Sequence, residues 1–492
     1  MLYETGPAVW GTFLAYLLAT FFFAWLAQRK ARGGAYMEEF FVGGRSIGPW
    51  VLGLTWIATS ASGGSFIGVP ALAHTNGYSM LLWIAGYVIS VLVGFGLLGQ
   101  RIAYVGRKTG ALTFPDLLRD RYDSPMIGGV SGVALIILYT GYIVAQYVAG
   151  ARVIEAVLGV PYLWGVLGFA VTVTLYTTYG GFRAVAWTDA FQAVVMLIGV
   201  LITVTFAISK AGGLEAIRAG LEQQDPALLS PMGPSNFLPI AAAISFFFIW
   251  PFAGAGQPSL MTRYLAADNP AGLNRALVLV AFYVILTYPA IILIGVTGRV
   301  LVPDLVAPDH AMPATIMAAV PSWLAGLVLA GPMAAIMSTL SSFLLVSSSA
   351  IVRDMVERNR KESLTEKQAK RWTLGSTIGV AAVCLVFALR PPDFLQYIVV
   401  FSGTGLAATF LTPTCLSLYW PGMNKTGCMA GILGGFTTFL AQYLAFGTRS
   451  FLDFDPFVWS LLFSLLFCIV GSLLGQRDDA EILVRYFDDY KA

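Results

Sequence analysis

The chain has 492 residues, of which 57% are hydrophobic and 11% are charged. Soluble domains carry about 25% charged residues, so this composition predicts a polytopic membrane protein rather than a soluble enzyme or a nucleic-acid-binding domain. The net charge of +3 is small. The four cysteines lie in apolar segments and there are only two histidines, which argues against a metal centre built from these residues.

Thirteen apolar segments are each long enough to cross a bilayer, for which a helix needs about 20 residues. They predict an all-α integral membrane protein with 13 transmembrane helices. The segments lie at residues 8–28, 49–70, 79–100, 126–150, 162–179, 187–209, 237–262, 276–298, 321–350, 373–389, 394–418, 428–446 and 457–475.

Basic residues are distributed unevenly over the loops between these segments. Cytoplasmic loops carry the excess of Lys and Arg in membrane proteins. With the N-terminus outside, 23 of the 29 basic residues fall in cytoplasmic loops or the C-terminal tail, and six fall outside. This distribution predicts a multi-pass protein of the cell membrane with an external N-terminus and a cytoplasmic C-terminus.

The second segment has an unusual centre for a membrane helix. It reads PWVLGLTWIATSASGGSFIGVP, with small hydroxyl residues and paired glycines from Thr59 to Ser65. An unpaired backbone group in the bilayer costs several kcal/mol, so membrane helices are normally continuous. A run of small polar residues is where such a helix breaks most cheaply, although small residues also allow close helix packing.

The seventh segment carries a second interruption signal. Pro251, Gly254, Gly256 and Pro258 fall within eight residues, and a proline inside a helix removes a backbone hydrogen bond. Segments two and seven are each the first of five, which is typical of a transporter with two inverted five-helix repeats. We therefore expect a 5+5 core of spans two to eleven, with parts at residues 1–48 (first peripheral helix and loop), 49–210 and 211–420 (the two repeats) and 421–492 (two peripheral helices and tail).

The ninth segment presents hydroxyl groups on one helix face. Ala335, Ser338 and Thr339 lie at positions i, i+3 and i+4. Their two hydroxyl groups and the Ala335 carbonyl, together with the carbonyl groups of Ala58 and Ala61 in the second segment, would offer five oxygen ligands. Hard cations prefer oxygen ligands, so these five residues form a predicted sodium site that needs no carboxylate.

Charged residues are scarce inside the predicted spans. None lies near the middle of a span, and Asp189 at the start of the sixth span comes nearest. Ionisable residues inside the membrane commonly mark proton or ion pathways. A proton pump driven by a buried carboxylate is therefore not expected, and no span centre offers an arginine to a substrate.

Five sequence blocks resemble the sodium/solute symporter family. The most diagnostic is LYTTYGGFRAVAWTDAFQ at residues 175–192. The others are EEFFVGGRSIGPW before the second segment, GQPSLMTRYLAAD from Gly256, PMAAIMSTLSSFLLVSSSAIVRD from Pro332 and YWPGMNKTGCMAGILGG from Tyr419. The resemblance runs from residue 36 to residue 475. It implies a ten-helix inverted-repeat core and sodium-driven uptake by alternating access.

The resemblance also carries over the family's ion-binding residues. The main sodium site of the family falls on the same five residues as the oxygen shell described above. Some members have a second sodium near the first, and the corresponding residues here are Ser341, Ser342 and Asp189. The alternative for Asp189 is a helix N-cap beside Trp187 and Thr188.

Within the family, three blocks are similar to the versions in sodium/pantothenate symporters, which implies pantothenate as the substrate. They are GRVLVPDLVAPDHAMP, GARVIEAVLGVPY and ASGGSFIG. The GQP and RYLAAD block is shared with proline symporters, which carry an aromatic residue where this chain has Gly254. That difference favours a roomier pocket and a larger carboxylate. Short monocarboxylates and proline are the alternative substrates.

The substrate, a small organic anion or zwitterion, is expected beside the interruption in the second segment. Free N–H groups at a helix N-terminus attract a carboxylate, and Gly63, Gly64 and Ser65 would supply them. Tyr and Trp residues nearby also fit a purely packing role. The remaining predicted contacts are Ser60, Ser62, Tyr87, Gln146 and Trp250.

Other classes of protein fit less well. A channel does not need paired interrupted helices, and a membrane sensor with a transporter-like domain is disfavoured because no soluble signalling domain follows Ala492. An enzyme is not expected, since phosphate-loop, nucleophile-elbow and metal-cluster motifs are missing. We expect a monomeric symporter surrounded by membrane lipid, with Na+ as the coupling ion and with neither a transition metal nor a nucleic acid as partner.

Overall fold

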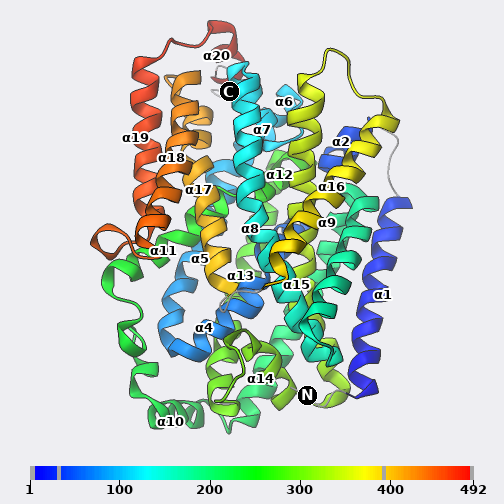
Figure 1. Ribbon diagram of the computed structural model, residues 1–492, viewed down its shortest axis with the longest axis vertical. Helices are drawn as coiled ribbons and strands as arrows, with labels where there is room; N and C mark the ends of the chain where they lie inside the picture. Colours follow the sequence, from blue (N-terminus) through cyan, green and yellow to red (C-terminus); the bar gives the residue numbers. More distant parts are fainter. Residues whose placement is uncertain (1–5, 30–34, 391–394, 488–492) are drawn as a thin grey trace.

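The computed structural model describes residues 6–29, 35–390 and 395–487, which fold into helices without any β-strand (Figure 1). The α-helices are α1 (Pro7–Arg29), α2 (Tyr36–Val42), α3 (Pro49–Ser60), α4 (Val69–Asn76), α5 (Leu81–Leu92), α6 (Gln100–Thr109), α7 (Phe114–Tyr122), α8 (Pro125–Leu158), α9 (Tyr162–Lys210), α10 (Leu214–Gln224), α11 (Ile240–Ala255), α12 (Pro258–Ala266), α13 (Leu273–Leu301), α14 (Ala311–Ala319), α15 (Ser322–Ser349), α16 (Glu366–Ala388), α17 (Leu395–Tyr419), α18 (Lys425–Phe446), α19 (Pro456–Leu474) and α20 (Ala480–Phe487). Three π-helical segments continue some of them, namely η2 (Gly64–Gly68), η4 (Val93–Gly99) and η9 (Ala350–Val356).

Local sequence signals define many helix ends. In α8, the Ser124 hydroxyl accepts a hydrogen bond from the Ile127 N–H, Pro125 occupies the first turn, and left-handed Gly159 ends the helix. Proline suits a first turn because the N–H it lacks would be unpaired there. Glycine suits the last position because it has no Cβ to clash. The long apolar segments thus begin and end at residues that favour those positions.

Within the described residues, ten helices are long and apolar enough to cross a membrane, or eleven if the bent pair α11 and α12 is one span. They coincide with eleven of the thirteen predicted segments. The other two are segment 49–70, where α3 ends at Ser60, and segment 162–179, which is the shorter apolar helix Tyr162–Thr178. The protein is an all-helical, multi-pass membrane protein, and the count of thirteen spans stays a prediction.

Helix α15 is the most enclosed of these helices, since 94% of its most apolar stretch of 18 residues is buried inside the protein. It packs against α9, α8, α1 and α3. Figure 1 shows α1 at one edge of the molecule and the paired α18 and α19 at the opposite edge, beside α17. The predicted sodium residues of the ninth segment therefore lie in the centre of the fold.

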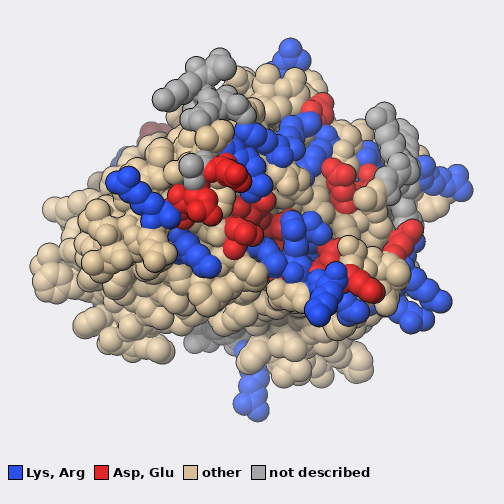
Figure 2. All heavy atoms as spheres, turned by 90° about the horizontal axis from the view of Figure 1, so that it is seen from above, with Lys and Arg blue, Asp and Glu red and all other residues tan. Residues whose placement is uncertain are grey.

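Charged side chains gather at the end of the molecule that carries α7 and α20 (Figure 2). Several of them form ion pairs between distant segments. Nη2 of Arg358 lies 2.8 Å from Oδ1 of Asp116 on α7. Nη1 of Arg121, also on α7, lies 2.7 Å from Oδ2 of Asp478 in the chain before α20. The first contact joins the segment after η9 to α7, and the second holds the C-terminal segment against α7.

A kink divides α9 at the paired glycines of the block at residues 175–192. Gly181 has φ 59° and ψ −172°, a conformation open essentially only to glycine. A Cβ at this position would lie 3.0 Å from Cδ2 of Phe40 on α2. The fifth and sixth predicted segments are therefore two helices that meet at a kink at Gly181.

Replacing Gly181 by alanine is expected to destabilise the protein by about 1–3 kcal/mol, the usual cost of holding a side chain in this backbone region. The thermal unfolding midpoint of the detergent-purified protein measures the effect. Gly168→Ala is the matched control on the same helix, because no atom lies within 4 Å of the Cβ it adds. Equal midpoints for the two variants would contradict the role of Gly181.

Candidate functional site

Helix α3 ends inside the protein, at the run of small residues in the second segment. Its last helical residue is Ser60, and Ala61 has φ −84° and ψ 85°. The helix resumes at Gly63 and continues as η2 and then α4. A Cβ on Gly63 would lie 2.7 Å from Cβ of Ala149 on α8, and one on Gly64 would lie 2.7 Å from Cγ1 of Val399 on α17. The glycines therefore allow α8 and α17 to approach the interruption.

The N–H groups at the restart of the helix already have partners. The Gly63 N–H donates to Oε1 of Gln146 at 2.8 Å, and the Gly64 N–H donates to Oγ of Ser62 at 3.1 Å. The expectation of free N–H groups at these two residues is wrong for this conformation. A backbone donor buried without a partner is costly, and here neighbouring side chains satisfy it. A substrate carboxylate would have to replace these partners.

The carbonyl end of α3 faces the hydroxyl groups of α15. Oγ of Ser338 lies 2.8 Å from the Ala58 carbonyl oxygen and 3.1 Å from that of Ala335. Oγ1 of Thr339 lies 3.4 Å from the Ala58 carbonyl and 3.1 Å from that of Thr59. All these residues are buried. Four of the five predicted sodium residues thus meet within hydrogen-bond distance, and Ala61 follows directly after α3.

The oxygens of this neutral cluster can give up a hydrogen bond with one another and contact a cation instead. The Ser338 hydroxyl is also 2.8 Å from the Ala334 carbonyl of its own helix. It can donate its single hydrogen to Ala334 and turn its lone pairs toward an ion beside Ala58. Oxygen ligands from carbonyl and hydroxyl groups suit a hard cation.

An aromatic layer lies on one side of the interruption. The Tyr87 ring stacks on that of Tyr288 with centroids 4.1 Å apart, and it lies 5.2 Å from the Trp250 ring. The Tyr87 hydroxyl donates to the Ser60 carbonyl at 2.8 Å, and the hydroxyls of Ser65 and Tyr288 are 3.1 Å apart. The structure thus brings the predicted residues Tyr87, Trp250, Ser60 and Ser65 together. Tyr288 was missed, since nothing distinguishes it within its apolar segment.

Two glutamines flank the restart of the helix. Gln146 on α8 and Gln396 on α17 are fully buried. In the part of the chain that the structure describes, Nε2 of Gln146 and both amide atoms of Gln396 have no hydrogen-bond partner. Buried amide groups without partners are costly and require an explanation, such as a ligand or water. Gln396 was missed because it lies at the edge of its predicted span, where a polar residue is unremarkable.

A buried ion pair lies one turn from the hydroxyl cluster. Nη2 of Arg263 is 3.2 Å from Oδ2 of Asp189, and the Thr55 hydroxyl donates to the same oxygen at 2.6 Å. Arg263 on α12, which the predicted segments place in a loop, is only 1% exposed and lies inside the protein. The N-cap alternative for Asp189 is wrong, because Asp189 lies inside α9. The sequence does indicate such an ion pair, because the single carboxylate of Asp189, once buried, needs a positively charged partner.

The three residues assigned to a second sodium do not face one point. Oγ of Ser342 lies 2.5 Å from Nη2 of Arg263 and 3.0 Å from Oγ1 of Thr59. The Ser341 hydroxyl instead donates to the Ser338 carbonyl of its own helix at 3.0 Å. Asp189 and Ser342 therefore lie near one another, and Nη2 of Arg263 contacts both of them.

The seventh segment bends where the prolines and glycines predict it. Helices α11 and α12 meet at an angle of 42°. A Cβ on Gly254 would lie 2.3 Å from Oγ of Ser90 on α5. Gly254 therefore permits close packing of two helices, and the space expected there for a larger substrate is filled by Ser90.

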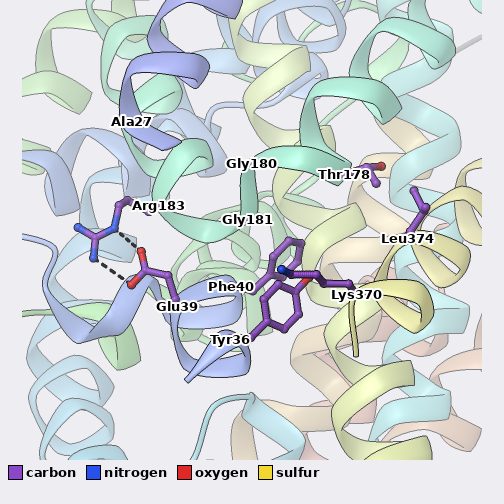
Figure 3. A pocket seen from close by; sticks show the side chains of 10 residues that line it. All are labelled: Ala27, Tyr36, Glu39, Phe40, Thr178, Gly180, Gly181, Arg183, Lys370 and Leu374. Atoms are coloured by element: carbon purple, nitrogen blue, oxygen red, sulfur yellow. Dashed lines mark hydrogen bonds and ion pairs between the residues drawn. The ribbon is translucent and has the colours of Figure 1, made fainter. Parts of the chain in front are cut away.

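A cavity of about 420 Å³ lies away from this site, at the kink of α9 (Figure 3). Glu39 and Arg183 line it as an ion pair, with Nη2 of Arg183 3.1 Å from Oε2 of Glu39. Nζ of Lys370 lies 5.4 Å from the centre of the Tyr36 ring. None of the predicted sodium or substrate residues lines this cavity.

Comparison with known proteins agrees with this architecture. The profile of the sodium:solute symporter family matches residues 40–435. The sodium/pantothenate symporter of Escherichia coli K12 is 34% identical over 463 residues, which cover 94% of this chain and 95% of the relative. That of Haemophilus influenzae is 33% identical, with 94% and 96% covered. The sodium/proline symporter of E. coli is 27% identical, with 96% and 95% covered.

Solved structures show the same fold at lower sequence identity. A Na+-coupled sialic acid symporter in a substrate-bound outward-open state matches with a TM-score of 0.80 and 19% identity, covering 96% of this chain and 99% of that one. The chain belongs to the sodium:solute symporter family. It is a transporter rather than an enzyme, and it couples the movement of a small solute to Na+.

Gly63→Ala is expected to abolish or strongly reduce solute uptake while the protein still reaches the membrane. The added Cβ would lie 2.7 Å from Ala149 and 2.9 Å from Oε1 of Gln146, so α8 would have to move away from the interruption. Sodium-driven uptake and membrane abundance are the measurements. Gly129→Ala serves as control, because it lies on α8 and its added Cβ meets no atom within 4 Å. Normal uptake by Gly63→Ala would contradict the close approach of α8.

Proposed function

We propose that this symporter imports pantothenate, or a small carboxylate of similar size, together with Na+ by alternating access. The observation that carries the proposal is the convergence of α15 hydroxyls on the carbonyl end of the interrupted helix α3. The proposed sodium ligands are Ala58, Ala61, Ala335, Ser338 and Thr339. The choice of pantothenate is supported by full-length relatives of that specificity at 33–34% identity.

The proposed substrate site surrounds the restart of the helix at Gly63. The aromatic layer of Tyr87, Trp250 and Tyr288 would cover the apolar part of the substrate. The unpaired Nε2 atom of Gln146 and the unpaired amide group of Gln396 would bind its polar groups. The other proposed contacts are Ser60, Ser62, Gly63, Gly64 and Ser65. Tyr87 is only 5% exposed and Trp250 only 8%, so access requires a conformation more open than this one.

The proposed architecture has thirteen spans, with spans two to eleven forming two inverted repeats and spans two and seven broken. The four parts proposed are residues 1–48, 49–210, 211–420 and 421–492. The end of α3 at Ser60 and the bend between α11 and α12 support this arrangement. The charged face around α7 and α20 supports a cytoplasmic C-terminus and an external N-terminus in the cell membrane (Figure 2).

Coupling follows from the position of the ion between two elements that must move. An ion held by α3 and α15 stabilises the interruption in the form that binds substrate. Linkage is reciprocal, so substrate raises sodium affinity by the same factor as sodium raises substrate affinity. We propose that the chain performs this cycle as a monomer in lipid.

Short monocarboxylates and proline are the alternative substrates. Relatives of 27% identity that transport proline keep proline in consideration, and the packing of Gly254 against Ser90 weakens the case for a roomier pocket. A transporter-like membrane sensor is the alternative from another class. It would bind the solute without accumulating it.

Uptake of labelled pantothenate into proteoliposomes tests the proposal. An inward sodium gradient is expected to drive accumulation that excess proline, lactate and pyruvate do not reduce, and a potassium gradient is the control. Sodium-dependent binding of one of these competitors, with no pantothenate uptake, would show that the substrate is a different solute and that Na+ is still the coupling ion. Sodium-dependent binding without accumulation would favour the sensor.

Replacing Ser338 and Thr339 together by alanine is expected to raise the sodium concentration for half-maximal uptake at least about tenfold. Loss of a hydrogen-bonding or ligand group is worth roughly 1–3 kcal/mol, and 1.4 kcal/mol is a factor of ten. Sodium titration of uptake is the measurement. Ser349→Ala is the control, because the Ser349 hydroxyl donates to the Val346 carbonyl of its own helix. An unchanged sodium dependence in the double variant would remove the proposed site.

A further inference from the structure

Arg263 places a cation among three side-chain oxygens that come from three different helices. Its Nη2 contacts Oγ1 of Thr59 on α3, Oδ2 of Asp189 on α9 at 3.2 Å and Oγ of Ser342 on α15 at 2.5 Å. All four side chains are at most 1% exposed. A carboxylate and two hydroxyls around one buried point form the donor set that a sodium ion would choose. In this chain the end of a guanidinium occupies that point.

The guanidinium is held in place from its other side as well. Its Nη1 donates to the Ser259 carbonyl at 2.8 Å, one turn earlier on α12. Its central carbon lies 5.4 Å from the centre of the Phe182 ring on α9. Arginine suits such a site because its planar, permanently charged group makes several directed hydrogen bonds at once. The position of Nη2 is therefore fixed by contacts that do not involve the three oxygens.

We infer that Arg263 is a tethered cation that takes the place of a second sodium ion, so that the protein binds one Na+ per transport cycle. The inference rests on the proposed sodium site between α3 and α15. Asp189 and Ser342 are two of the three residues at which a second sodium is expected, and both contact Arg263. A sodium ion at the same oxygens would have to displace a guanidinium or lie directly beside it.

Charge balance points in the same direction. Asp189 and Arg263 compensate each other, so the cluster is neutral before any ion arrives. A sodium ion entering this low-dielectric region would meet the repulsion of Arg263, and the one carboxylate there, Asp189, already balances the charge of Arg263. The main site differs, because its oxygens are neutral and no charged side chain contacts Ser338 or Thr339 in the described part of the chain.

The tethered cation is also connected to the main sodium site through one residue. Thr59 contacts Arg263 with its hydroxyl, and its carbonyl accepts a hydrogen bond from Thr339 at 3.1 Å. Arg263 thereby positions the end of α3 as a bound ion would. The role of Arg263 is to set the ion stoichiometry, while Ser338 and Thr339 bind the transported ion.

Equilibrium binding of radiolabelled sodium to the purified protein tests this inference without knowledge of the substrate. The wild type is expected to bind one ion per chain, and Asp189→Asn is expected to bind one or none. Two ions in the wild type, falling to one in Asp189→Asn, would overturn the inference. No saturable sodium binding at all would overturn the proposed sodium site and this inference with it.

Arg263→Gln removes the tethered charge and is expected to raise the number of bound ions from one to two. Arg263→Lys keeps a cation and is expected to bind one. Arg275→Gln removes an exposed arginine on α13 and is the matched control for loss of charge, with one ion expected. A single site in Arg263→Gln would show that the three oxygens are not a cation site and would overturn the inference. If that variant does not fold, the number of sodium ions bound by the wild type decides whether the inference holds.

Discussion

The rest of the structure depends on the contact between the carbonyl end of α3 and the hydroxyl groups of α15. A helix that ends inside a membrane protein leaves carbonyl groups that must find partners. Ser338 and Thr339 provide them for Ala58 and Thr59. We propose the same carbonyl groups as ligands for a cation, and an ion that binds there would exchange one set of partners for another. This exchange connects ion binding directly to the backbone of the interrupted helix.

Polar groups around this contact differ in whether their charges are compensated. Arg263 balances the charge of Asp189, although Oδ1 of Asp189 and Nε of Arg263 have no hydrogen-bond partner among the described residues. Gln146 and Gln396 keep amide atoms without partners beside the restart of the helix. The ion pair therefore supports the structure, and we propose that the two glutamine amides bind the substrate. With a single sodium and a single carboxylate, transport would be electroneutral and the membrane potential would not contribute its roughly 2.3 kcal/mol per charge per 100 mV.

Local patterns in the sequence predict much of this arrangement. Long apolar segments coincide with the helices that can cross a membrane, and the run from Thr59 to Ser65 marks the end of α3 because small polar residues break helices cheaply. The spacing of Ala335, Ser338 and Thr339 puts them on one face of α15. The contacts that Arg263 and Gln146 make with distant segments could not be predicted in this way. Arg263 counts as a loop charge until its side chain meets Asp189 on α9. The N–H of Gly63 has no partner within its own segment, and Gln146, 83 residues away, supplies one.

Amide hydrogen exchange at the interruption is the measurement that tests the central claim most directly. The peptides covering Ala58 to Gly68 would be followed in detergent-purified protein, in sodium and in an equal concentration of potassium. An ion held by the end of α3 and by α15 should order this segment, so exchange is expected to be slower in sodium, and this protection should be lost when Ser338 and Thr339 are alanine. Equal exchange in the two cations, in a protein that still transports its solute with sodium, would show that the ion binds elsewhere.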